Sequence, residues 1–93
     1  MILIDPPLAE GRGRLWSHLA SDVSYDELHV FAREAGVPER GFDRDHYDVP
    51  SEWYDAMVAL GATPVTSREL VKRLVAAGLR RRKPGRSAVG NGA

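Results

Sequence analysis

The sequence predicts a small α/β fold: a mixed sheet of three to four strands with about three helices, in a single domain covering residues 1–79. Three observations predict this class. Short β-branched or alternating runs, bounded by proline or glycine, indicate strands. Capping-box patterns followed by apolar residues at helical spacing indicate helices. Strands and helices alternate along most of the chain, so the sheet is expected to be mostly parallel where helices connect its strands.

Composition narrows the chemistry that the chain can perform. The 93 residues are 43% hydrophobic and include no cysteine, which excludes disulfides, a thiolate nucleophile and a thiolate zinc site. Any metal must therefore be held by histidine and carboxylate. The apolar start, Met1–Ile4, is too short for a signal peptide or a membrane span, so a cytoplasmic protein with no membrane partner is expected.

The formal net charge is zero, but the charges are unevenly placed. Residues 1–79 hold 8 basic against 13 acidic residues, whereas residues 80–93 hold 5 basic residues and no acidic one. This C-terminal segment is almost free of apolar residues and is expected to be a disordered tail. Its basic run is a candidate for nonspecific contacts with nucleic-acid phosphates: Arg80, Arg81, Arg82 and Lys83.

The first strand is expected at Ile2–Ile4, where a β-branched run stops just before two prolines. Asp5 then lies at the carboxyl end of that strand, the edge at which ligands of open α/β sheets gather. Asp5 is therefore a site candidate, and an Asx-type turn before the prolines is an equally weighted alternative. Alternation in residues 15–20 indicates a second strand that places Trp16 and His18 on one face. His18 is either a half-buried, hydrogen-bonded imidazole or a site residue.

The loop between these strands, residues 8–14, contains Arg12 and Arg14. Their guanidinium groups are forked donors suited to phosphate or carboxylate. The Gly-x-Gly within the loop precedes a strand rather than opening a helix. It therefore supports neither a P-loop nor a dinucleotide-binding fingerprint.

Helices are expected at three places. The capping boxes at residues 24–27 and 66–69 predict helices that end before Gly36 and Gly78, each with an apolar stripe on one side. Ser51 is expected to cap a further helix between them.

Residues 40–50 carry more chemistry than any other stretch: one histidine, one tyrosine, three aspartates and two arginines. The segment from His46 to Val49 reads as a short strand, and alternation places His46 and Asp48 together on one face. Arg40 and Arg44 are candidate anion donors. Tyr47, on the other face, is a ligand-binding candidate with core packing as the alternative.

Five motifs resemble the bacterial and phage DUF4031 family, in order and spacing, over about residues 1–79. They are Leu3-Ile4-Asp5-Pro6-Pro7, Trp16-Ser17-His18-Leu19, Glu27-Leu28-His29, Arg40-Gly41-Phe42-Asp43 and His46-Tyr47-Asp48-Val49-Pro50. The resemblance implies no established activity. It marks a set of polar positions that match the family pattern: Asp5, His18, His29, His46, Tyr47 and Asp48.

The expected site consists of Asp5, His18, His46 and Asp48, bordered by Arg12, Arg14, Arg40, Arg44 and Tyr47. Its four central residues act either as ligands of a divalent metal or as metal-free acid and base groups. The predicted function is binding or hydrolysis of a phosphorylated or nucleotide-like small ligand. The alternative is a non-catalytic module that binds nucleic acid or protein through the basic tail. A homodimer is also considered, because so small a sheet has exposed edges.

Overall fold

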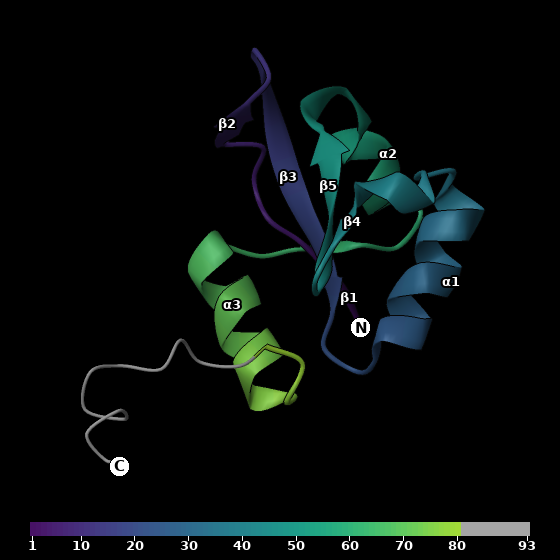
Figure 1. The fold of residues 1–93 in the computed structure, drawn as a ribbon, viewed down its shortest axis with the longest axis vertical. Helices are drawn as coiled ribbons and strands as arrows, with labels where there is room; N and C mark the ends of the chain where they lie inside the picture. The colour runs from purple at the N-terminus through teal and green to yellow at the C-terminus, as the bar shows by residue number, and fades with distance from the viewer. Residues whose placement is uncertain (81–93) are drawn as a thin grey trace.

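The computed structural model describes residues 1–80 as a mixed sheet with α3 on one face and α1 and α2 on the other (Figure 1). The strands are β1 (Ile2–Ile4), β2 (Ala9–Gly11), β3 (Arg14–Ser21), β4 (Phe42–Asp43), β5 (His46–Pro50) and β6 (Thr63–Pro64). The α-helices are α1 (Tyr25–Ala35), α2 (Tyr54–Ala59) and α3 (Ser67–Ala76), and two 3₁₀ helices are η1 (Glu39–Gly41) and η2 (Ser51–Trp53).

The sheet has more strands than the sequence predicts, and fewer parallel pairs. Its order is β4-β5-β3-β1-β6, and β2 pairs with β3 beside this path. Within the described residues only β1 and β6 pair in parallel. The prediction of mostly parallel pairing is wrong because the chain leaving α1 does not enter the sheet directly as β5. It first forms β4 and then turns back at Arg44, whose φ of 62° makes a tight turn.

Two of the three helices begin where the capping boxes predict. The Ser24 hydroxyl accepts the Glu27 amide at 3.0 Å at the start of α1, and Thr66 accepts the Glu69 amide at 3.0 Å at the start of α3. The expected cap at Ser51 is wrong. Residues 51–53 form η2 instead, and α2 follows without a side-chain cap. Among residues 1–80, no helix is long and apolar enough to cross a membrane.

Each face of the sheet has its own apolar core. The larger core packs α1 and α2 against residues such as Leu19 and Tyr47, whereas α3 packs Leu70 and Leu74 against Leu3 and Ala20. Successive strand residues thus alternate between the two cores, as their period of two requires. Consequently the residues that flank Leu19 and Tyr47 in the chain lie on the α3 face, which places both strand histidines there.

Candidate metal centre

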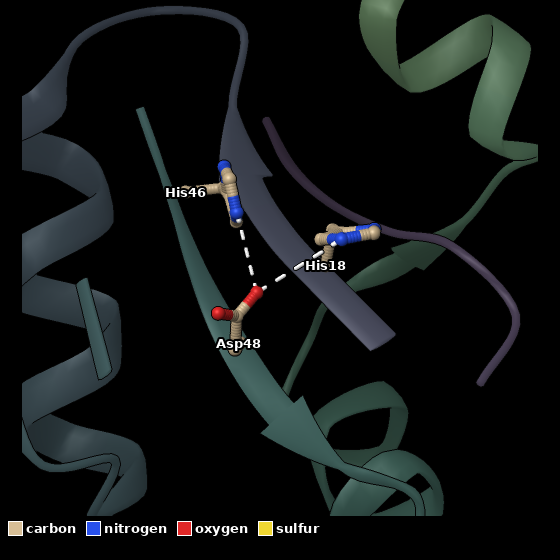
Figure 2. Close-up of side chains that lie close together, drawn as sticks. All are labelled: His18, His46 and Asp48. Atoms are coloured by element: carbon tan, nitrogen blue, oxygen red, sulfur yellow. Dashed lines mark ion pairs between the residues drawn. The ribbon is translucent and has the colours of Figure 1, made fainter. Parts of the chain in front are cut away.

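Three side chains on the α3 face of the sheet converge on one point: His18 from β3, and His46 and Asp48 from β5 (Figure 2). His18 lies directly opposite Asp48 in the strand register. Asp48 Oδ1 is 3.2 Å from His46 Nε2 and 3.9 Å from His18 Nε2. The two imidazoles meet edge to face, with centroids 4.9 Å apart. One ligand atom from each residue lies within 4.8 Å of the others.

His18 is oriented from behind by Asp5, which is 2% exposed. Asp5 Oδ2 lies 2.8 Å from His18 Nδ1, and Oδ1 accepts the His18 backbone amide at 2.6 Å. The Ser67 hydroxyl donates to Oδ2 at 2.8 Å. Burial raises the pKa of Asp5, but these hydrogen bonds outweigh burial and the net pKa is lowered. The hydrogen bond to Asp5 in turn raises the pKa of His18.

His46 is oriented in the same way by Asp45, which is 7% exposed. Asp45 Oδ1 lies 2.7 Å from His46 Nδ1. Arg80 donates a hydrogen bond to each oxygen of this carboxylate, from Nε to Oδ2 at 2.8 Å and from Nη2 to Oδ1 at 3.0 Å. Burial raises the pKa of Asp45, yet the bonds from Arg80 and His46 leave it below its usual value. Each histidine therefore has a buried, ionised carboxylate behind its Nδ1.

These carboxylates decide which nitrogen of each ring faces the point of convergence. An ionised carboxylate can only accept, so the Nδ1 of His18 and of His46 must donate to it. In the neutral imidazole the lone pair is then on Nε2, and both Nε2 atoms point toward Asp48. Three electron-pair donors that face one another repel unless a cation or protons lie between them. The donor set of two imidazoles and one carboxylate, with carboxylates behind the imidazoles, is typical of divalent transition-metal sites.

The distances are compatible with one ion. Ligand atoms that each lie about 2.1 Å from a metal are about 3.0–3.4 Å apart. The 3.2 Å between His46 Nε2 and Asp48 Oδ1 falls in that range. The 3.9 Å from Asp48 Oδ1 to His18 Nε2 is longer than this range, so these two side chains would have to approach by about 0.5 Å to share the ion. The side chains of His18 and Asp48 are 34% and 41% exposed, so both border solvent.

The structure brings together the four residues predicted as the centre of the site, but Asp5 stands behind His18 rather than beside the other ligand atoms. The arginines predicted to border the site lie elsewhere and are exposed. Arg12 and Arg44 lie in turns, Arg14 begins β3, and Arg40 lies in η1. Arg14 pairs with Glu52 at 2.8 Å, and Arg44 lies 3.9 Å from Asp43. Within residues 1–80 no arginine of the four has a hydrogen bond or ion pair with the converging side chains: Arg12, Arg14, Arg40 and Arg44.

Tyr47 and His29 lie on the opposite face of the sheet. Tyr47 is 2% exposed within the larger core, and its hydroxyl is 2.7 Å from His29 Nδ1. Both rings also contact Phe42 edge to face. This placement corresponds to the core-packing alternative for Tyr47 and separates His29 from the other two histidines.

Sequence reasoning missed three residues of the site: Asp45, Ser67 and Arg80. Strand alternation assigns Asp45 to the face opposite His46, and only the turn at residues 44–45 brings its carboxylate back to the imidazole. Ser67 gave no signal beyond its place in a capping box. The sequence places Arg80 in the basic tail, whereas in the structure its guanidinium pairs with Asp45. The remaining tail residues named for nucleic-acid binding lie outside the described residues: Arg81, Arg82 and Lys83.

A family model described as "Protein of unknown function (DUF4031)" matches residues 2–77. The comparisons with curated proteins and with solved structures return no match. The matched region contains the three converging side chains and Asp5, Asp45 and Ser67, but it stops before Arg80. The match covers most of the chain and agrees with the resemblance of its motifs, so the protein belongs to the DUF4031 family.

Proposed function

We propose that His18, His46 and Asp48 bind a divalent transition metal, and that this centre hydrolyses a phosphorylated or nucleotide-like small ligand. The observation that carries the proposal is the convergence of two Nε2 atoms and one carboxylate oxygen, with each imidazole held by a buried carboxylate. Structural zinc sites use four protein ligands, whereas catalytic sites use three and leave a position for water or substrate. Three donors at a partly exposed location favour the catalytic kind.

The chemistry follows from the ligand set. A divalent metal held by His18, His46 and Asp48 would supply hydroxide at neutral pH, because such an ion lowers the pKa of a bound water to about 7. Hydrolysis would consume one water: its oxygen would bond to phosphorus, the bond from phosphorus to the leaving oxygen would break, and the leaving oxygen would take a proton. The products would be a phosphate and an alcohol.

Trp16 supports a nucleotide as the ligand. It precedes His18 by two residues on β3 and lies on the same face, so the two side chains are about 7 Å apart. Its indole is anchored by a 2.8 Å hydrogen bond from Nε1 to the Gly11 carbonyl. A base stacked on this ring would place its phosphate near the three converging side chains.

Arg14 currently occupies part of that position, with its guanidinium carbon 5.4 Å from the Trp16 ring centroid. An exposed cation–π contact contributes about 0.5–1 kcal/mol. Stacking of a base on an aromatic side chain contributes about 1–3 kcal/mol. The Arg14 guanidinium also pairs with Glu52 at 2.8 Å, but both side chains are exposed and such ion pairs are weak. A base can therefore displace the guanidinium from the ring, and the phosphate then takes the place of Glu52 as the acceptor of its forked donors.

The first prediction concerns the metal. Protein stripped with chelator is titrated by calorimetry with Zn²⁺, Mn²⁺, Co²⁺ and, without oxygen, Fe²⁺. One equivalent is expected to bind, and His46→Ala is expected to weaken binding at least about 100-fold because one of three ligands is lost. His29→Gln is the matched control, since His29 lies on the other face of the sheet, and its affinity should equal that of the wild type.

Two results would contradict this prediction. If the wild type binds none of the ions, or if His46→Ala binds as tightly as the wild type, the centre is not a metal site. Stoichiometric Fe²⁺ binding without hydrolysis of any phosphate ester would instead contradict the hydrolase half of the proposal. The same donor set is known from iron oxygenases.

The second prediction concerns the base. The chain has two tryptophans, so Trp53→Phe leaves Trp16 as the only indole. In this metal-loaded variant AMP is expected to quench the fluorescence, and ribose 5-phosphate is not. Adding Trp16→Leu should weaken AMP binding about 10-fold, measured by calorimetry, whereas Trp16→Phe should retain most of it. Equal affinities for AMP and ribose 5-phosphate would remove the base from the proposal and leave the phosphate in place.

A further inference from the structure

We infer that α3 is a clamp for the metal centre, so that metal binding and the docking of α3 on the sheet stabilise each other. The inference rests on the proposed metal site. Ser67, the first residue of α3, donates to Asp5 at 2.8 Å, and Arg80, just beyond its last turn, donates twice to Asp45. The two carboxylates that orient the metal-binding histidines are therefore each held from one end of the same helix.

The chain path after α3 is fixed closely enough for Arg80 to act in this way. Gly78 adopts a φ of 75°, the left-handed conformation that ends a helix. The amides of Leu79 and Arg80 then donate to the Leu74 carbonyl at 2.9 and 3.2 Å. The Tyr25 hydroxyl donates to the Leu79 carbonyl and ties the segment to α1. These contacts turn the chain back over the sheet, where the guanidinium meets Asp45.

The packing of α3 makes it the element whose docking on the sheet can respond to metal binding. It rests on a small core of its own, formed with Leu3 and Ala20, apart from the larger core beneath α1 and α2. Elements that bury few apolar contacts open at a smaller free-energy cost than the whole domain does. When α3 lifts, Asp5 loses the Ser67 hydroxyl and Asp45 loses the Arg80 guanidinium. The imidazoles behind which they stand then lose their fixed orientation.

The expected size of the coupling comes from other metalloproteins. Loss of a group that orients a metal-binding histidine typically weakens metal affinity 10- to 100-fold. Coupling free energies are reciprocal, so a metal that prefers the clamped state must also favour docked α3 by the same factor. The family match ends at residue 77, so the Arg80 end of the clamp lies outside the matched region.

The test compares Zn²⁺ affinity and backbone hydrogen exchange in the full-length protein and in Ser67→Ala, Arg80→Gln and Arg80→Lys. Ser67→Ala and Arg80→Gln are each expected to weaken Zn²⁺ binding about 10-fold. Arg80→Lys should recover part of the loss, because an ammonium can reach one carboxylate oxygen but cannot grip both. In the wild type, Zn²⁺ should slow the hydrogen exchange of the α3 amides. The fold-change in exchange rate should be similar to the fold-change in Zn²⁺ affinity that Ser67→Ala or Arg80→Gln causes.

Arg73→Gln is the matched control. Arg73 lies within α3 and pairs with Glu69 at 2.9 Å and Asp22 at 3.3 Å, without contact to Asp5 or Asp45. It should leave Zn²⁺ affinity within about twofold. If Arg73→Gln weakens binding as much as Arg80→Gln, Arg80 has only a structural role and the inference is wrong. Bound Zn²⁺ that leaves α3 exchange unchanged also overturns the clamp, yet keeps the metal centre. A flat wild-type titration overturns both.

Discussion

At the residue scale, the chemistry depends on two aspartates that are not themselves ligands of the proposed metal. His18 and His46 can serve as metal ligands only if the proton of each neutral ring is on Nδ1, and the carboxylates of Asp5 and Asp45 hold it there. Neither aspartate could act in this way if it were protonated, and hydrogen bonds keep the pKa of both low despite burial. The ability of the two imidazoles to bind a metal thus depends on two buried charges beside them.

This dependence makes Asp5→Asn a sharp test. The amide group of asparagine donates toward His18 Nδ1, so the ring proton moves to Nε2 and blocks the metal-binding lone pair. We expect metal affinity, measured by calorimetry, to fall about 10- to 100-fold. The free energy of unfolding should fall by about 1–3 kcal/mol, because charge-assisted hydrogen bonds inside the domain are replaced by weaker ones.

Asp26→Asn is the control for this change, since Asp26 is exposed in the first turn of α1. It should alter neither metal affinity nor stability by a comparable amount. Unchanged metal affinity in Asp5→Asn would show that the tautomer of His18 does not matter, and would therefore argue against His18 as a ligand.

At the scale of elements, the two capped helices have different tasks. α1 covers the larger core on the face away from the histidine pair, whereas α3 contacts Asp5 through Ser67 and the segment after it contacts Asp45 through Arg80. Both begin at a hydroxyl that accepts an amide at 3.0 Å: Ser24 in α1 and Thr66 in α3. Because the two caps are alike, removing each in turn can show whether only α3 affects the metal site.

The expected outcome of removing each cap follows from this division. Ser24→Ala and Thr66→Ala should each lower the free energy of unfolding by about 1 kcal/mol in urea titrations, the usual contribution of such a cap. Only Thr66→Ala should also weaken metal binding, because it loosens the end of α3 that carries Ser67. If both changes weaken metal binding equally, the effect comes from general destabilisation and not from α3.

The β4–β5 hairpin shows why short elements escape prediction. β4 is only Phe42–Asp43, too short for alternation to be visible, and its turn contains Arg44 with a φ of 62° rather than the usual glycine or asparagine. That turn nevertheless reverses β5 and brings the carboxylate of Asp45 to His46. The two-residue strand β4 and its turn thus determine both the direction of β5 and the position of the carboxylate that orients His46.

At the scale of the whole molecule, the sheet separates structure from chemistry. The larger core and the contact between His29 and Tyr47 lie on one face, and the proposed metal centre lies on the other, the face on which α3 packs. The predictions of nucleic-acid binding through the basic segment, of a homodimer and of a cytoplasmic location stay predictions. Arg80, which the sequence places in that segment, instead belongs to the site, where it donates to both oxygens of Asp45.

Local sequence patterns are enough to predict the α/β class, the starts of α1 and α3, and the face on which each strand residue lies. These properties depend on local periods and on caps that involve residues three apart, so they can be read from neighbouring letters. The sequence also singled out His18, His46 and Asp48, because His46 and Asp48 share a strand face and His18 lies on a second strand.

The surroundings of these side chains, in contrast, depend on how distant segments of the chain pack together. Asp45 is the chain neighbour of His46, but the other contacts that fix the two carboxylates join residues far apart in the chain: Asp5 with His18, 13 residues on, Asp45 with Arg80, 35 residues on, and Asp5 with Ser67, 62 residues on. No local period connects such positions. They meet because strand register and the docking of α3 bury an acidic side chain, and a buried carboxylate requires donors from whichever segments pack against it.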